Sequence, residues 1–316
     1  MEYRTLGRTG LKVSAVSLGG WLTFGNTVDG ATTKKIVHRA LDLGINHVDT
    51  ADVYAQGGCE SALGEALFGV RRAGYVLASK VFWPTGPGPN DRGLSRKHVM
   101  ESCAASLARL KTDYLDLYYC HRYDPDVPLE ETVRAMEDLV TQGRILHWGV
   151  SCWTSAQIRD AMKLATRHAP VVDQPPYNVF DRHIEKDVLA TCAKEGLGVV
   201  VWSPLAQGVL TGKYLPGKPE DARASNAKVN KFIEKYLTKD ATATVKKLAS
   251  IAEGAGLAMN QLALGWCLRR PEVTSVIVGA TSVAQIEENA KAATPPKDVL
   301  AAVERVVKDA PLVDSV

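Results

Sequence analysis

The sequence predicts an α/β fold, a (β/α)8 TIM barrel, and two observations support that prediction. Short apolar runs rich in β-branched residues alternate with longer stretches of helical periodicity, and this alternation occurs eight times. No linker rich in Ser, Pro or Gly divides the 316 residues, so we expect a single domain over 1–316. Eight parallel strands joined by crossover helices close into such a barrel.

The eight units follow one another along the chain, each a strand and then a helix. The expected strands are 13–20, 45–50, 75–80, 114–121, 145–151, 171–177, 197–205 and 273–280. The expected helices are 32–43, 60–68, 95–110, 129–142, 155–166, 183–194, 241–254 and 282–293. Ser95 stands where an N-cap is needed, and Gly143 and Gly196 stand where helices end.

Segments outside this alternation are expected to be long loops at the C-terminal mouth of the barrel and extra helices. The loops are a Gly- and Pro-rich stretch at 84–93 and a polar stretch at 214–239, with a short helix near 227–236. The tail 298–308 has the pattern of a further helix. An open doubly wound sheet is the alternative, but no G-x-G-x-x-G follows any predicted strand.

Composition narrows the function. The chain is 46% hydrophobic and 23% charged with a net charge of +3, which is typical of globular proteins and gives no nucleic-acid signature. Six irregularly spaced cysteines form no C-x-x-C, which disfavours zinc and redox motifs and favours free thiols in a cytoplasmic protein. No apolar run approaches 18 residues, so no membrane insertion is expected.

Four polar residues stand where the second, third and fourth strands give way to loops. Asp49 ends the second strand, Tyr54 follows in its loop, Lys80 ends the third and His121 ends the fourth. Each alone could be a loop cap, a packed ring or a solvated strand end. Together they predict a catalytic site, because active sites of such barrels lie at the C-terminal ends of the strands.

Physical chemistry suggests a role for each of the four. A free tyrosine has a pKa of about 10, and a lysine ammonium nearby favours the phenolate and lowers that value. A carboxylate holds the lysine charged and oriented, and a histidine can polarise a carbonyl. Such a set can donate a proton to a carbonyl oxygen as hydride reaches its carbon.

These residues lie within longer stretches that resemble the aldo-keto reductases, in particular the branch of the potassium-channel β-subunits and their bacterial relatives. The resemblance covers nearly the whole chain, through RTLGRTGLKVSAVSLGGW, DTADVY, RGLSRKHV, PLEETVRAMEDLVTQGRI, WGVS, WSPLAQGVLTGKY and GATSVAQIEEN. It implies that Asp49, Tyr54, Lys80 and His121 are the family's catalytic tetrad. The channel subunits tend to carry asparagine at the last position, and this chain has histidine.

The resemblance also implies NADPH/NADP+ as the cofactor, bound without a Rossmann fold. Gly20, Trp21 and Asp49 would lie near its nicotinamide, and Ser151 and Gln174 would hold the carboxamide. The other implied contacts are Trp202, Ser203, Pro204, Leu205, Ala206 and Gln207 over the pyrophosphate, Lys213 and Arg223 at phosphate, Gly279, Thr281 and Gln285 at the 2′-phosphate, and Glu288 and Asn289 at the adenine. Cys152 stands where the family usually has Asn or Arg.

The residues themselves support the phosphate end in part. The Gly-rich turn that begins at Gly279 leads into a predicted helix, and backbone N–H groups at a helix N-terminus attract anions. The loop after the eighth strand is also where barrels often hold phosphate. Without the resemblance, this turn could equally be a simple helix cap, and Lys213 and Arg223 could be ordinary surface charges.

Aromatic residues are expected at the same mouth: Trp21, Tyr54, Phe82, Trp83, Tyr123 and Trp153. About half should serve packing. The others, with His121, would form an apolar substrate pocket, which suggests aldehydes and ketones with little charge.

Three functions therefore remain under consideration. The first is an NADPH-dependent reductase of small-molecule carbonyl compounds. The second is a nucleotide-sensing subunit that associates with a membrane protein and has weak or no turnover. The third is a Schiff-base lyase that uses Lys80, as barrel lysines at strand ends can. Assembly into a homo-oligomer stays open.

Overall fold

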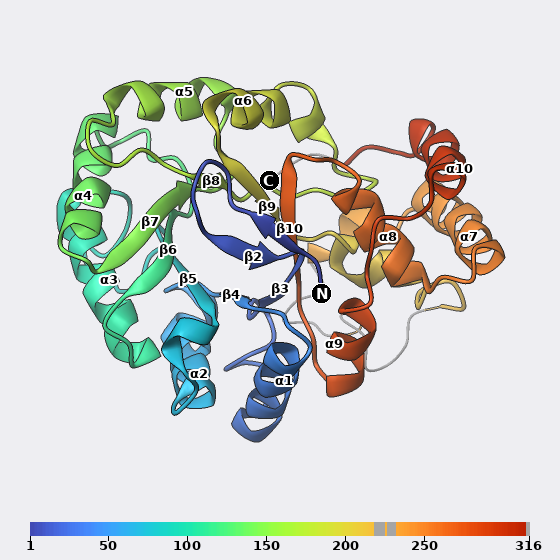
Figure 1. Ribbon diagram of the computed structural model, residues 1–316, viewed down its shortest axis with the longest axis horizontal. Coiled ribbons are helices and arrows are strands. Elements are labelled where there is room, and N and C mark those ends of the chain that lie inside the picture. The colour runs from blue at the N-terminus through green and yellow to red at the C-terminus, as the bar shows by residue number, and fades with distance from the viewer. Residues whose placement is uncertain (218–224, 226–231, 314–316) are drawn as a thin grey trace.

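Eight parallel strands close into a barrel in the computed structural model, which describes residues 1–217, 225 and 232–313 (Figure 1). The last strand pairs with both the first and the seventh, so the sheet has no free edge. The predicted barrel is confirmed, and the open doubly wound alternative is wrong. In barrel order, the strands are β10 (Val273–Val278), β3 (Val16–Gly19), β4 (His47–Asp49), β5 (Val76–Val81), β6 (Leu115–Cys120), β7 (Ile145–Val150), β8 (Val172–Asp173) and β9 (Gly198–Val201).

Helices surround the strands, as Figure 1 shows. Seven of the eight expected helices are confirmed to within a few residues at their ends, and Asp29, Ser95, Thr154, Thr238 and Ser282 cap them through side-chain oxygens. The tail helix is also confirmed. The helices are α1 (Gly30–Asp42), α2 (Gly58–Leu67), α3 (Arg96–Leu110), α4 (Leu129–Thr141), α5 (Ser155–Leu164), α6 (Val188–Glu195), α7 (Lys239–Gly254), α8 (Met259–Leu268), α9 (Val283–Asn289) and α10 (Lys297–Lys308).

The structure corrects three predictions. The expected first strand is split, because 12–14 belongs to a hairpin of β1 (Tyr3–Thr5) and β2 (Lys12–Ser14) that was not predicted. The expected helix 183–194 begins as one 3-10 turn, and α6 starts only at Val188. Helix α8 was missed because residues 262–268 are all buried. A helix that is apolar on every side shows no amphipathic period.

The interior of the barrel is a packed core. All six residues of β5, of β6 and of β10 are buried, as expected for strands covered on both faces. Leu6 and Val13, from the hairpin and its turn, join Ala78, Tyr119 and Val200 in one buried cluster. The hairpin therefore closes the N-terminal end of the barrel, which faces the viewer in Figure 1, and leaves the C-terminal end for a site.

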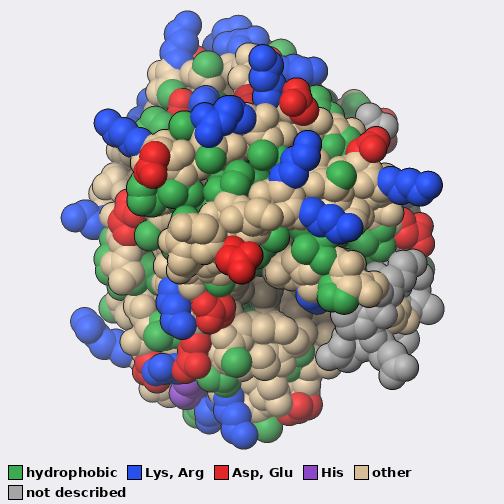
Figure 2. Space-filling view, turned by 90° about the vertical axis from the view of Figure 1, so that its right-hand side faces the viewer, with side chains coloured by type: hydrophobic (Ala, Val, Ile, Leu, Met, Phe, Trp, Pro, Cys, Tyr) green, Lys and Arg blue, Asp and Glu red, His purple; other side chains and the backbone are tan. Residues whose placement is uncertain are grey.

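The long segment after β9 contains two 3-10 turns within the described residues, Ala206–Thr211 and Glu234–Tyr236. Of the short helix predicted near 227–236, residues 232–236 are described and contain the second of these turns, whereas 227–231 lie outside the described residues. In the part of the chain that the structure describes, no helix is both long and apolar enough to cross a membrane. On the face shown in Figure 2, basic and acidic side chains are interspersed among the described residues.

A buried carboxylate anchors the loop that enters β8. Glu137 of α4 accepts the backbone N–H groups of Thr166 (2.8 Å), Arg167 (2.6 Å) and His168 (3.0 Å). Burial alone would raise the pKa of Glu137, but these three hydrogen bonds outweigh it and the pKa lies below its ordinary value.

We expect Glu137→Gln to destabilise the protein at pH 7 by about 1.5–3 kcal/mol, because an amide cannot satisfy three N–H donors as a carboxylate does. A depressed folded-state pKa contributes stability above the ordinary pKa, and that stability is lost as the pH falls through the folded value. Urea unfolding at pH 7 and near pH 3 measures this, with the exposed Glu130→Gln of the same helix as control. An equal loss at both pH values would show that Glu137 acts by packing alone.

Candidate active site

Three of the four candidate catalytic residues are joined by direct hydrogen bonds. The Nζ of Lys80, which is fully buried, donates to Asp49 Oδ2 (2.5 Å), to the Thr50 carbonyl (2.7 Å) and to the Tyr54 hydroxyl (3.3 Å). An ammonium has three donors, so all three are assigned. Lys80 therefore has a fixed position next to the phenol.

The Asp49 carboxylate is also fixed from the opposite side of the barrel. Its Oδ1 accepts from Gln174 Nε2 at 2.8 Å, and Gln174 follows the short strand β8. The Ser151 hydroxyl, at the end of β7, donates to the Gln174 carbonyl at 2.7 Å. The two residues predicted to hold a carboxamide are thus adjacent, and one of them orients Asp49.

A tight turn after β4 carries Tyr54. Ala55 and Gln56 have φ of 50° and 54°, in the left-handed region that residues other than glycine rarely adopt. The turn places the Tyr54 ring edge-on to His121, with centroids 5.7 Å apart, and 6.3 Å from the Trp21 ring. Asp49 and Tyr54, five residues apart in the sequence, therefore meet at the same ammonium, that of Lys80.

The pKa of Tyr54 differs from the expectation that Lys80 would lower it. Burial, and after it the negative charge of Asp49, raise the pKa of Tyr54 well above its ordinary value. The Asp49 carboxylate, 2.5 Å from Lys80, also offsets the charge of the ammonium that was expected to lower the pKa. The phenol therefore keeps its proton at neutral pH, which suits a proton donor.

His121 lies where β6 ends, and it is buried with its Nδ1 lacking a partner among the described residues. Burial lowers the pKa of His121 well below its ordinary value, and the nearby charges of Lys80 and Arg122 act in the same direction. The imidazole is therefore neutral near pH 7. A neutral imidazole still has one N–H to offer a carbonyl oxygen.

A second layer of acidic and basic side chains lies behind the Tyr54 turn, and these residues were not predicted from the sequence. Asp52 Oδ2 accepts from Ser102 Oγ of α3 at 2.7 Å, and burial raises the pKa of Asp52 to about 7. Glu60, fully buried, accepts from Ser79 Oγ (2.5 Å) and Arg109 Nε (2.7 Å). The acidic residues of DTADVY and GCESALG were the available signal, since a buried carboxylate needs a partner.

Backbone strain is concentrated at the same end of the barrel. Residues with positive φ include Leu22 after β3, Cys152 after β7, and Ser203, Ala206 and Gln207 after β9. None is a glycine, so each of these conformations is unfavourable and must be held by its surroundings. Such clusters are typical of ligand-binding sites.

The loops that carry Gly20 and Gly279 lie against each other. A Cβ on Gly279 would be 3.8 Å from Thr23 Cγ2 and 3.9 Å from the Gly19 carbonyl oxygen. Trp21, in the first loop, packs edge-on against Trp202, with ring centroids 6.1 Å apart. The predicted cofactor-binding residues in the loops after β3, β9 and β10 are therefore neighbours.

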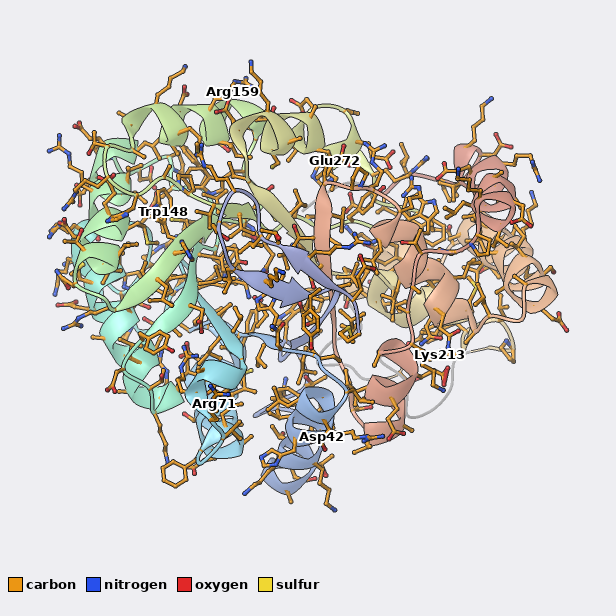
Figure 3. The ribbon with its side chains drawn as sticks, viewed as in Figure 1. Asp42, Arg71, Trp148, Arg159, Lys213 and Glu272 are labelled. Atoms are coloured by element: carbon orange, nitrogen blue, oxygen red, sulfur yellow. The ribbon has the colours of Figure 1, made fainter. Side chains whose placement is uncertain are left out.

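The remaining cofactor candidates follow β9 and β10. Gln207 Nε2 donates to Ser203 Oγ at 2.8 Å, and Thr281 N donates to Gln285 Oε1 at 2.8 Å. In the structure, Glu288 accepts from Gln261 (2.7 Å) and Asn289 from Asn260 (2.8 Å), so both α9 residues also join that helix to α8. Figure 3 places Lys213 on the side of the barrel where α8 and α9 lie. Pro204 and Leu205 belong to the loop after β9, and Arg223 lies outside the described residues.

The aromatic candidates divide into two groups. Trp153 is buried and packs edge-on against Tyr123, with ring centroids 5.1 Å apart, which assigns it to packing. Trp83 is 38% exposed, and its ring lies 5.0 Å from Phe82 and 6.4 Å from His121. Trp83 therefore has surface to offer a ligand.

Comparison with known proteins agrees with this geometry. The model of the aldo/keto reductase family matches residues 15–308, nearly the whole chain. This chain belongs to the aldo/keto reductase family. It is therefore an oxidoreductase of the kind that generally uses NAD(P)H.

Two similar proteins come from plants. One from Arabidopsis thaliana, named "Probable voltage-gated potassium channel subunit beta", is 46% identical over 299 residues, which cover 92% of this chain and 91% of that protein. A protein of the same name from Oryza sativa subsp. japonica is 45% identical over 299 residues, which again cover 92% of this chain and 91% of that protein. The resemblance to the channel β-subunit branch is thus confirmed.

Proposed function

We propose that this protein reduces aldehydes and ketones to alcohols with NADPH, and that Tyr54 is the general acid. The observation that carries the proposal is the hydrogen-bonded set of Asp49, Lys80 and Tyr54 beside a neutral His121. The match to the family over 15–308 supports a single catalytic domain. Six free cysteines support a cytoplasmic location, where thiols stay reduced.

The groups at the mouth fit the cofactor. Trp21 and Trp202 offer aromatic surface to a flat ring, and Ser151 and Gln174 offer a hydroxyl and an amide to a carboxamide. The hydroxyl and N–H of Thr281, in the loop after β10, donate to Gln285 Oε1 in the structure and would turn to a phosphate when NADPH binds, with Lys213 as a cation. NADPH, when bound, supplies the hydride for the carbonyl carbon.

The chain's own residues supply the proton. Tyr54 donates its phenolic proton to the carbonyl oxygen as negative charge develops there. Lys80, 3.3 Å away, stabilises the phenolate that remains, and Asp49 holds Lys80 in place. His121 donates its one N–H to the same carbonyl oxygen and orients the substrate.

The two alternatives have different support. The names of the plant relatives, which call them probable potassium channel β-subunits, favour a subunit that associates with a membrane protein. As a nucleotide sensor, such a subunit would bind NADPH and turn over slowly or not at all. A Schiff-base lyase fits less well, because Lys80 is fully buried and its three donors are already engaged. NADPH oxidation followed with a panel of aldehydes tests the proposal. Steady turnover would support the reductase, whereas tight NADPH binding without turnover would favour the sensor.

We expect NADPH to bind more tightly than NADH, since the 2′-phosphate adds a charged group for Thr281, Gln285 and Arg223. Hydrogen bonds to charged groups contribute roughly 1.5–3 kcal/mol each, so Arg223→Ala should weaken NADPH binding about tenfold or more and leave NADH nearly unchanged. Quenching of tryptophan fluorescence measures both, with Arg305→Ala on α10 as the control. Equal losses for both cofactors would place Arg223 at the pyrophosphate, and equal wild-type affinities would remove the preference itself.

A further inference from the structure

A cation that the proposed mechanism does not use lies at the substrate side of the mouth. Arg122 directly follows His121, and its guanidinium turns back so that one nitrogen donates to the His121 carbonyl at 2.6 Å. Its Cζ lies 5.7 Å from the centroid of the Trp83 ring, and that ring lies 6.4 Å from the imidazole of His121. Arg122, Trp83 and His121 therefore form one group.

No carboxylate among the described residues forms an ion pair with Arg122. Several other half-buried arginines, Arg72, Arg109 and Arg269 among them, each have an acidic partner within 3.2 Å, whereas Arg182, like Arg122, forms no ion pair among the described residues. The nearest acidic side chain in the Arg122 loop, Asp124, accepts instead from the backbone N–H groups of residues 94 (2.7 Å) and 126 (3.0 Å). The guanidinium thus has donors to offer, since it carries five N–H groups.

The charge of Arg122 acts on three titratable groups at the C-terminal ends of the strands. Burial and Asp49 raise the pKa of Tyr54, and Arg122 opposes them. Burial likewise raises the pKa of Cys152, and Arg122 again opposes it. Arg122 also acts on His121. One positive charge is therefore felt at the ends of β4, β6 and β7.

We infer that Arg122 is a specificity residue that selects carbonyl substrates with an anionic substituent, a carboxylate or a phosphate. This rests on the proposed reductase function and replaces the sequence-based expectation of substrates with little charge. A guanidinium binds either anion through two parallel hydrogen bonds. Trp83 beneath it and the His121 carbonyl restrict its motion, so less rotational freedom is lost when the anion binds.

Three aldehydes of one scaffold test this: benzaldehyde, 4-carboxybenzaldehyde and 4-formylphenyl phosphate. We expect wild type to favour the anionic aldehydes in kcat/KM. In Arg122→Gln the ratio of anionic to neutral kcat/KM should fall by roughly 10- to 100-fold, and Arg122→Lys should restore part of it. A fall for the phosphate alone, or for the carboxylate alone, identifies the recognised anion.

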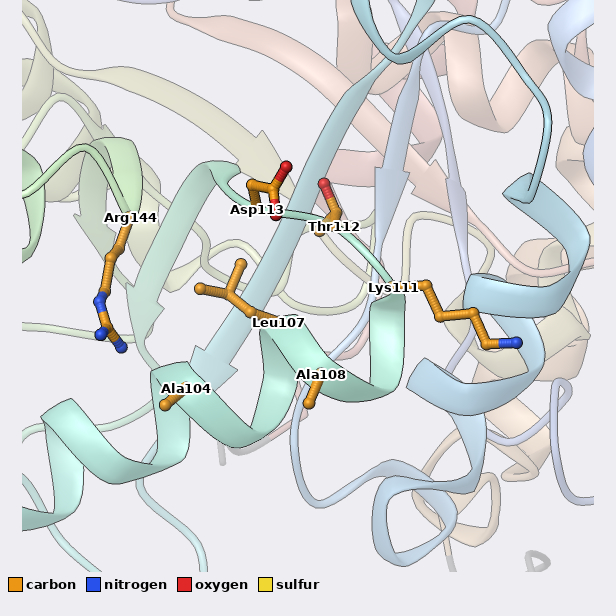
Figure 4. A pocket seen from close by; sticks show the side chains of 7 residues that line it. All are labelled: Ala104, Leu107, Ala108, Lys111, Thr112, Asp113 and Arg144. Carbon is orange, nitrogen blue, oxygen red and sulfur yellow. The ribbon is translucent and has the colours of Figure 1, made fainter.

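The control removes an exposed arginine at the opposite end of the barrel. Arg144 borders a shallow depression formed with the end of α3 and the loop before β6, shown in Figure 4. Arg144→Gln changes the net charge by the same amount and should leave the ratio as in wild type.

Two outcomes would overturn the inference. One is equal selectivity in wild type and Arg122→Gln while all three aldehydes are reduced, which leaves the reductase function intact. The other, which needs no variant and so no question of folding, is a wild type whose kcat/KM for both anionic aldehydes is no higher than for benzaldehyde. If none of the aldehydes is reduced, the reductase proposal fails first and the inference with it.

Discussion

Tyr54→Phe is expected to lower kcat for carbonyl reduction by about a hundredfold or more, the scale of general acid catalysis. The phenol is the group that we assign as proton donor, and its pKa, raised by burial, keeps it protonated at neutral pH. Phenylalanine keeps the ring, so its edge-on contact with His121 should survive. Single-turnover and steady-state assays with NADPH and an aldehyde measure the loss.

Cofactor binding provides the internal control for this variant. No contact that we propose for NADPH involves the Tyr54 hydroxyl, so fluorescence titration should give a Kd close to that of wild type. The assignment of Tyr54 would be wrong if the variant kept more than about a tenth of the wild-type kcat, because acid catalysis is expected to supply more than that. A large rise in Kd with little change in kcat would instead make Tyr54 a binding residue.

The convergence of Asp49, Lys80 and His121 could be predicted from the geometry of a parallel barrel. All strands end on one side, so residues at the ends of β4, β5 and β6 must meet. The side-chain alternation of β5 completes the argument: Lys80 contacts Asp49 on the inside, whereas its neighbour Ser79 contacts Glu60 of α2 on the outside. The alternation along β5 therefore places Lys80 and Ser79 on opposite faces of the strand.

The pKa shifts and ion pairs of the site could not be predicted in the same way, since they depend on distances between side chains in the folded structure. Lys80 was expected to lower the pKa of Tyr54, but burial of the phenol, and after it the negative charge of Asp49 beside the ammonium, raise that pKa instead. Arg122 escaped notice for a related reason. Its importance comes from the lack of an acidic partner among the described residues, and a sequence does not show which charges remain unpaired.

The backbone conformation of the loops could not be predicted from the sequence either. Cys152 and Ser203 adopt positive φ without being glycine, so neither gave a turn signal. Helix α8 was missed for the opposite reason, because its residues are too uniformly apolar to show a face. Periodicity thus located the amphipathic helices and missed α8, whose residues 262–268 are all buried.

Lys80→Met should be the second most damaging change, with kcat lowered by roughly a hundredfold. The ammonium is the cation within hydrogen-bond distance of the Tyr54 oxygen, at 3.3 Å, and its loss leaves the Asp49 carboxylate buried without its ion-pair partner. Both effects oppose the phenolate that forms when the proton is transferred. The pKa of Tyr54 should therefore rise further above its already elevated value.

Alcohol oxidation with NADP+ reveals this shift, because the phenolate then accepts the proton and the rate rises with pH. We expect the rising limb of the Lys80→Met profile to lie at higher pH than that of wild type. The double variant Asp49→Asn/Lys80→Met removes both charges. The rising limb of its pH profile should therefore lie at lower pH than that of Lys80→Met, while its kcat stays low. It also separates catalysis from folding, since no unpaired charge remains buried. An unchanged limb in Lys80→Met would mean that Lys80 supports the fold of the site and does not tune the phenol.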